Sequence, residues 1–145
     1  MIFWDSSAIV PLLVDEPSSQ QLLDRLEADS GMLVWWGSPV ECSSAIARRE
    51  REGDLSVSQA SQALERLQAI LRAWHEILPS EAVRQIAQRL LRVHDLRAGD
   101  ALQLAAAIVG SENKPASLAF LSLDERLNTA ALREGFPLDS SLQRR

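Results

Sequence analysis

Short apolar runs alternate along the chain with longer segments whose apolar residues recur every three or four positions. The runs have the length of buried strands, and the longer segments have the period of amphipathic helices. The expected strands are 2–4, 32–36, 77–78, 118–121 and 136–138, and the expected helices are 8–14, 20–28, 38–53, 56–71, 81–93, 98–108 and 124–135. Alternation of this kind builds a parallel sheet covered on both faces. The sequence therefore predicts the α/β class, as a single three-layer α/β/α domain with a parallel sheet spanning residues 1–145.

Composition excludes several classes of protein. The 145 residues carry a net charge of −5 and have a pI of about 5.0, which argues against a sequence-independent DNA coat with a basic face. No apolar run approaches the roughly 20 residues that span a bilayer. The amino-terminal residues show neither a basic stretch nor a small-residue cleavage site, so no secretory signal is expected. With Cys42 as the single cysteine, a cytoplasmic location fits best.

Four acidic residues occupy equivalent places in the predicted strand–helix units. Asp5 ends the first strand, and Asp124 follows the strand 118–121 and opens the last helix. Glu41 and Asp100 lie in the first turns of the helices that start near residues 38 and 98. In a parallel sheet the carboxyl ends of the strands share one edge, and the returning helices begin at that edge. All four acids are therefore predicted on one side of the molecule.

Four acids on one side of the molecule are a pattern that predicts a metal-dependent reaction. Carboxylates at close range raise each other's pKa values, and a divalent cation removes that penalty. The two histidines and Cys42 do not have a familiar zinc-site spacing, so the expected ions are Mg²⁺ or Mn²⁺ with oxygen ligands. Two such ions can promote phosphodiester cleavage without a protein nucleophile. Whether one or two ions act stays open from the sequence.

Each acid also has a simpler structural interpretation. Glu41 reads as the third helical residue of a capping box with Ser38. Asp100 and Asp124 are acids that suit a helix amino terminus in any protein. Asp5 resists this interpretation most, because an acid after an all-apolar strand has little evident structural use. The presence of four acids on one edge of the sheet nevertheless favours a catalytic role over a purely structural one.

Neighbouring polar residues provide candidate supports. Ser6 and Ser122 could donate hydrogen bonds to the acids, or could act only as local caps, Ser122 through a box with Glu125. Arg97, three positions before Asp100, is a candidate for binding a substrate phosphate.

Four segments resemble the successive motifs of PIN-domain ribonucleases. They are residues 3–8, 40–41, 96–105 and 120–127, with the segment around Asp100 the most specific. The length and helix pattern are similar to the VapC-type toxins of prokaryotic toxin–antitoxin pairs, and the resemblance extends to about residue 138. Gly99 departs from the pattern, since a larger small residue such as alanine is common there, but its presence removes no ligand.

The resemblance to PIN-domain ribonucleases implies a fold, a set of cation ligands, an activity and a partner. It implies a five-stranded parallel sheet, with Mg²⁺ or Mn²⁺ held by Asp5 and Asp100 and with Glu41 and Asp124 completing the pocket. It also implies endonucleolytic cleavage of RNA, for which transfer RNA is one suggested substrate. It further implies a homodimer whose site is covered by a small antitoxin protein.

Two other functions remain open at this point. A phosphoryl-handling domain, such as a receiver or a haloacid dehalogenase-type phosphatase, would share the topology. The phosphatase needs a second acid where Ser7 stands, and the receiver needs a late lysine, for which only Lys114 exists. A non-catalytic interaction module of the same fold is the second alternative. Retention of all four acids counts against that module.

Overall fold

A four-stranded parallel sheet lies at the centre of the computed structural model, which describes residues 1–139. The strands are β1 (Ile2–Trp4), β2 (Met32–Trp35), β3 (His75–Ile77) and β4 (Ala119–Leu121), in the order β3-β2-β1-β4. Every adjacent pair is parallel, and Phe3 of β1 pairs with Leu33 on one side and Phe120 on the other. The predicted parallel sheet is confirmed.

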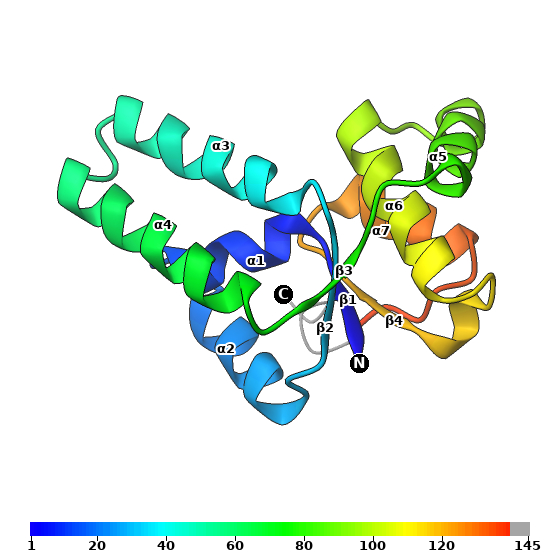
Figure 1. The fold of residues 1–145 in the computed structure, drawn as a ribbon, viewed down its shortest axis with the longest axis horizontal. Coiled ribbons are helices and arrows are strands. Elements are labelled where there is room, and N and C mark those ends of the chain that lie inside the picture. The colour runs from blue at the N-terminus through cyan, green and yellow to red at the C-terminus, as the bar shows by residue number, and fades with distance from the viewer. Residues whose placement is uncertain (140–145) are drawn as a thin grey trace.

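Helices cover both faces of this sheet, as the ribbon in Figure 1 shows. One face carries α1 (Ser6–Leu13), α2 (Ser19–Ala28), α3 (Ser38–Arg51) and α4 (Val57–Leu71). The other carries α5 (Glu81–Val93), α6 (Ala98–Gly110) and α7 (Glu125–Arg133), with a short 3₁₀ turn, η1 (Pro115–Ser117), leading into β4. The molecule is therefore the three-layer α/β/α structure predicted from the sequence.

Alternation along β1 divides the core into two halves. Ile2 and Trp4 pack among the helices α1–α4, while Phe3 faces α5–α7, and all three are almost fully buried. On the second face the ring of Phe3 stacks on Phe120, with centroids 5.5 Å apart, and Phe120 contacts Phe136. Because both faces of the sheet are covered, its short strands are continuously apolar.

The carboxyl-terminal part of the sheet differs from expectation. The resemblance implied five strands, but residues 1–139 contain four, and the segment predicted as strand 136–138 forms only an isolated parallel bridge between Leu138 and Phe120. Its backbone contacts to β4 are limited to two hydrogen bonds, both on Phe120. The expected strand 77–78 is displaced to His75–Ile77, because the backbone pairs with β2 before Leu78. No helix among residues 1–139 has the length and hydropathy to cross a membrane.

Candidate active site

Asp5 lies at the carboxyl end of β1 and is nearly buried, with 4% of its surface exposed. Its Oδ2 accepts hydrogen bonds from the Ser7 hydroxyl at 2.5 Å, the Ser122 hydroxyl at 2.8 Å and the Ser7 backbone N–H at 3.3 Å. Burial raises the pKa of Asp5 despite these donors, and the negative charge of Asp100 adds to the rise. The expectation that Asp5 lacks a structural use was wrong, since it caps α1, which begins at Ser6 and not at residue 8.

Glu41 projects from the first turn of α3. Its Oε1 accepts a hydrogen bond from Gln103 Nε2 at 3.0 Å, and the Ser6 hydroxyl also donates to its carboxylate. Burial, together with the charges of Asp5 and Asp100, raises the pKa of Glu41 to about 7, against the hydrogen bonds from Gln103 and Ser6, which lower it. Glu41 therefore lies within the electrostatic field of two other predicted site acids.

The predicted capping box at the start of α3 was wrong. Gly37 occupies the cap position, Ser38 is the first helical residue, and no side chain caps the helix. The fully buried Ser38 hydroxyl lies 2.8 Å from Gln103 Nε2, so it is engaged in the core of the site. The local interpretation of Glu41 as a capping acid is thereby removed.

Asp100 lies in the first turn of α6, and Asp124 is the residue that caps α7. Burial raises the pKa of Asp100, and the charge of Asp124 adds to this effect, while Arg97 and Arg126 oppose it. Asp124 caps α7 by accepting the Leu127 N–H at 3.0 Å, so its predicted structural role is confirmed. At this edge of the sheet the charge of Asp100 raises the pKa values of Asp5 and Glu41, and the charge of Asp124 raises that of Asp100.

Serine hydroxyls connect the acids to the surrounding backbone. Ser122 accepts the Asp124 N–H at 3.0 Å and contacts the Ser7 hydroxyl at 3.1 Å, in addition to Asp5. Ser7 also accepts the N–H of Leu123 at 2.8 Å. The alternative box of Ser122 with Glu125 does not form, because Asp124 is the cap. Ser122 therefore contacts two of the predicted acids, and the Ser6 hydroxyl lies 2.8 Å from Gln103 Nε2. The supporting role of both serines stays a prediction.

Two arginines flank the acids. A cleft of about 500 Å³ is lined by Arg97, Gly99, Asp100, Asp124 and Arg126. Among the ion pairs of residues 1–139, Arg126 takes part in one, a 3.8 Å pair with the highly exposed Asp95. Sequence reasoning missed Arg126, because it reads as one more charged residue on an exposed helix. The cleft thus combines Asp100 and Asp124 with two guanidinium groups, those of Arg97 and Arg126, that form no ion pair shorter than 3.8 Å among residues 1–139.

The four acidic side chains carry the type of donor atom, carboxylate oxygen, that a hard divalent cation prefers. Among the ion pairs of residues 1–139, none involves Asp5, Glu41, Asp100 or Asp124. Buried carboxylates without a positive partner are costly, and oxygen-rich sites select Mg²⁺ and Mn²⁺. In the described conformation of residues 1–139, no three His, Cys, Asp or Glu side chains are grouped closely enough to enclose an ion.

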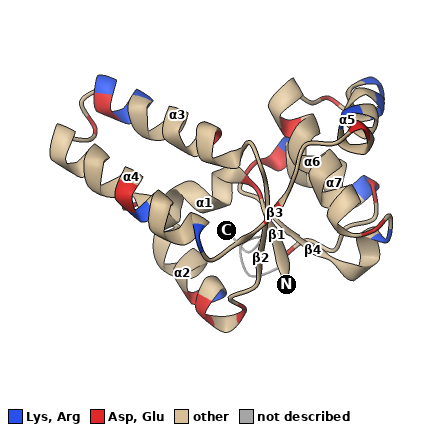
Figure 2. Ribbon diagram, viewed as in Figure 1, with Lys and Arg blue, Asp and Glu red and all other residues tan. Residues whose placement is uncertain are grey.

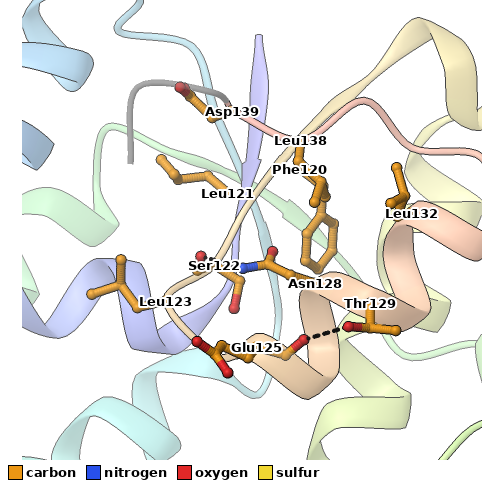
Figure 3. A pocket seen from close by; sticks show the side chains of 10 residues that line it. All are labelled: Phe120, Leu121, Ser122, Leu123, Glu125, Asn128, Thr129, Leu132, Leu138 and Asp139. Carbon is orange, nitrogen blue, oxygen red and sulfur yellow. Dashed lines mark hydrogen bonds between the residues drawn. The ribbon is translucent and has the colours of Figure 1, made fainter. Parts of the chain in front are cut away.

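Other notable features lie apart from the acids. The pocket in Figure 3, about 490 Å³, lies between β4 and α7 and shares Ser122 with the site but is lined by none of the four acids. The last turn of α3 carries Arg48, Arg49 and Arg51, at the opposite end of the helix from Glu41 (Figure 2). At 1.5 Å per residue these arginines begin roughly 10 Å along the axis from Glu41.

Comparison with known proteins identifies the family. A sequence model of the PIN domain matches residues 2–132. The chain belongs to the PIN domain family. It is 28% identical over 135 residues to Ribonuclease VapC45 of Mycobacterium tuberculosis, an alignment that covers 93% of this chain and 92% of the relative. The similarity to this relative is therefore distant but extends over nearly the whole chain.

Solved structures with the same fold include one that is described as a toxin–antitoxin complex. FitAcB from Neisseria gonorrhoeae has a TM-score of 0.68 at 18% identity, and the match covers 97% of this chain and 98% of that one. A toxin–antitoxin complex from Klebsiella pneumoniae has a TM-score of 0.64 at 14% identity, covering 97% and 98%. At such identities these similarities establish the fold of this PIN domain.

Proposed function

We propose that the protein is a metal-dependent endoribonuclease and the toxin of a type II toxin–antitoxin pair. The observation that carries the proposal is the placement of Asp5, Glu41, Asp100 and Asp124 at one edge of the sheet of a PIN domain. The charge of Asp100, which raises the pKa values of Asp5 and Glu41, supports it. The similarity to a ribonuclease over 93% of the chain supports RNA as the substrate. Transfer RNA is the substrate type to test first.

The carboxylates have the following proposed roles. Asp5 and Asp100 hold Mg²⁺ or Mn²⁺, and Glu41 and Asp124 complete the pocket. When bound, the cation supplies a Lewis acid for the phosphodiester and a positive charge that offsets the carboxylates. The three hydrogen bonds from Ser7 and Ser122 fix the orientation of the Asp5 carboxylate before the ion arrives.

The arginines of the cleft are the proposed contacts to RNA. Arg97 and Arg126 line the same cleft of about 500 Å³ as Asp100 and Asp124. Guanidinium groups bind phosphate oxygens in bidentate fashion. We therefore assign both residues to the phosphates that flank the cleaved bond. Without them, the negative charge of the acids would repel the RNA backbone.

The chain offers no cysteine nucleophile at this site. Cys42 is fully buried, and burial raises the pKa of its thiol to about 12, with the charges of Glu41 and Asp5 contributing. A thiol with this pKa is not a thiolate at neutral pH. Attack by water is therefore the proposed route of cleavage.

An antitoxin protein is the proposed partner. FitAcB and the Klebsiella pneumoniae complex share this fold, and the latter is described as a toxin–antitoxin complex. A segment that places a positive side chain among the acids would neutralise them as a cation does. A homodimer, expected from the family resemblance, remains part of the proposal.

Cleavage of single-stranded RNA in Mg²⁺ or Mn²⁺ tests the function. The wild type is expected to cleave, and Asp5→Asn and Asp100→Asn are expected to be inactive while folded. Asparagine is as good a helix cap as aspartate, so Asp5→Asn removes the charge without removing the cap. Glu81→Gln, which removes an exposed acid from the first turn of α5, is the matched control. Full activity in both aspartate variants would reject the site.

A further inference from the structure

Gln103 lies on α6, almost one turn after Asp100, and is 1% exposed. Its Nε2 lies 2.8 Å from the Ser6 hydroxyl, 2.8 Å from the Ser38 hydroxyl and 3.0 Å from Glu41 Oε1. One buried amide group therefore contacts the starts of α1 and α3 from α6. These are the three helices whose amino-terminal ends bear or adjoin Asp5, Glu41 and Asp100.

The contact with Gln103 fixes which oxygen of Glu41 is available. Oε1 is the atom that accepts the Gln103 hydrogen bond. Oε2 faces the start of α6, 3.9 Å from the position that a Cβ atom on Gly99 would occupy. Gly99 directly precedes Asp100 in the chain. Gln103 thus binds one oxygen of the carboxylate and leaves the other directed toward the Asp100 side of the site.

This orientation needs a restraint. Glutamate has three rotatable side-chain bonds, and the charges of Asp5 and Asp100 both disfavour an ionised Glu41 beside them. A free glutamate at this position would turn toward solvent, which lowers both the repulsion and the loss of side-chain entropy. An N–H donor from a residue that is itself packed in the core opposes that motion.

Stability alone gives a poor account of Gln103. Its Oε1 is buried and has no hydrogen-bond partner among residues 1–139. An unpaired buried carbonyl costs free energy, and an apolar residue of the same shape would avoid the cost. The two N–H bonds of Nε2 are shared among three oxygens, all of them at the site. The orientation of the Gln103 amide therefore favours the contacts of its nitrogen and leaves its oxygen without a partner among residues 1–139.

We infer that Gln103 is a positioning residue that holds Glu41 in the orientation needed to complete the cation site. This inference rests on the proposed nuclease function. Gln103 touches neither RNA nor the ion in this assignment, and it acts through Glu41. Partners that orient metal ligands commonly contribute 10- to 100-fold to affinity or activity.

The test uses Gln103→Met, which keeps the approximate size of the side chain and removes the N–H donors. Titration calorimetry is expected to show Mn²⁺ affinity lowered about 10- to 100-fold. The kcat for RNA cleavage should fall in parallel, with KM for RNA unchanged. Gln88→Met, which alters an exposed glutamine on α5, should match the wild type in all three constants.

A double-mutant cycle separates positioning from packing. If Gln103 acts through Glu41, then Gln103→Met should have no further effect on Mn²⁺ affinity in a Glu41→Gln background. Equal losses in both backgrounds would overturn the inference, as would a Gln103→Met protein that is less stable but binds Mn²⁺ normally. Gln103→Asn, whose shorter amide does not reach Glu41, is the second variant if the methionine form does not fold.

Failure of this inference is distinct from failure of the function. A wild type that binds Mn²⁺ and cleaves RNA, with Gln103→Met and Gln103→Asn indistinguishable from it, overturns the role of Gln103 alone. A wild type that neither binds Mn²⁺ nor cleaves RNA rejects the proposed function, and the inference is rejected with it.

Discussion

The hydroxyl of Ser122 donates a 2.8 Å hydrogen bond to Asp5 Oδ2, joining the end of β4 to the end of β1 across 117 residues of sequence. The same hydroxyl accepts the backbone N–H of Asp124. One side chain thus connects two of the four acids and holds the start of α7 against the sheet.

Ser122→Ala should impair both stability and activity. The change removes a donor from a buried carboxylate and the acceptor of the Asp124 N–H, which predicts a loss of about 1–3 kcal/mol in the free energy of unfolding. RNA cleavage should fall at least about tenfold. Ser122→Thr retains the hydroxyl and should keep most of both. Denaturant titration and initial cleavage rates measure the two effects, and normal rates in the alanine variant would contradict the assignment.

Substitutions of Asp124 should separate its role as the cap of α7 from its proposed role in RNA cleavage. Asp124→Ala loses the hydrogen bond to the Leu127 N–H and is expected to be less stable by about 1 kcal/mol. Asp124→Asn keeps a cap oxygen and should unfold at the wild-type midpoint. Both variants should lose cleavage activity, because both lose the charge. An active Asp124→Asn would show that this residue is only a cap.

The two glycines of α6 should respond oppositely to alanine. A Cβ on Gly99 would meet nothing closer than Glu41 Oε2 at 3.9 Å, so Gly99→Ala should raise the free energy of unfolding by about 0.4–1 kcal/mol. A Cβ on Gly110 would lie 2.7 Å from Leu33 Cδ2. The overpacking cost, about 1–3 kcal/mol, cancels or exceeds the gain there. Thermal unfolding of both variants checks the pair, and stabilisation by Gly110→Ala would contradict the packing described.

The metal-free protein should lose stability as the pH rises from 5 to 8. The pKa of Glu41 is raised from 4.5 to about 7, chiefly by burial, so at pH 5 the folded state keeps a proton that the unfolded state has largely released, and the folded state loses it as the pH passes 7. Stability falls with pH wherever the folded state binds more protons. The raised pKa values of Asp5 and Asp100 act in the same direction.

Thermal unfolding in a chelator at several pH values measures this effect. Glu41→Gln should flatten the decline, since it removes the titrating group. Saturating Mg²⁺ should stabilise the wild type more at pH 8 than at pH 5, because the cation competes with protons for the same oxygens. A midpoint that rises with pH in the chelator would contradict the electrostatic description of the site.

The sequence predicted that the acids lie at one edge of the sheet, because the topology of a parallel sheet leaves little freedom. A parallel sheet places the end of β1 beside the end of β4, and the helices that carry Glu41 and Asp100 begin at the same edge. Strand and helix periodicity was therefore sufficient to place Asp5, Glu41, Asp100 and Asp124 on one side. Their mutual distances required the three-dimensional structure.

Contacts between side chains were not predictable in this way. Gln103 reads as one polar residue in an apolar helix, and its partners depend on the rotation of α6 against α1 and α3. Ser38 matched a capping box by local pattern, but a tertiary contact with Gln103 takes its hydroxyl and the helix begins elsewhere. At Ser38 a hydrogen bond between distant segments determines the structure, and the local sequence preference does not.

The central claim is that a divalent cation binds between Asp5 and Asp100. Crystals of the protein soaked in Mn²⁺ test it most directly, through the anomalous scattering of the metal. The account predicts a peak at the cleft beside α6, within ligand distance of carboxylate oxygens from both residues and absent in Asp100→Asn. The claim would be contradicted if the carboxylates of Asp5 and Asp100 pointed to different faces of the molecule and no manganese peak lay between them.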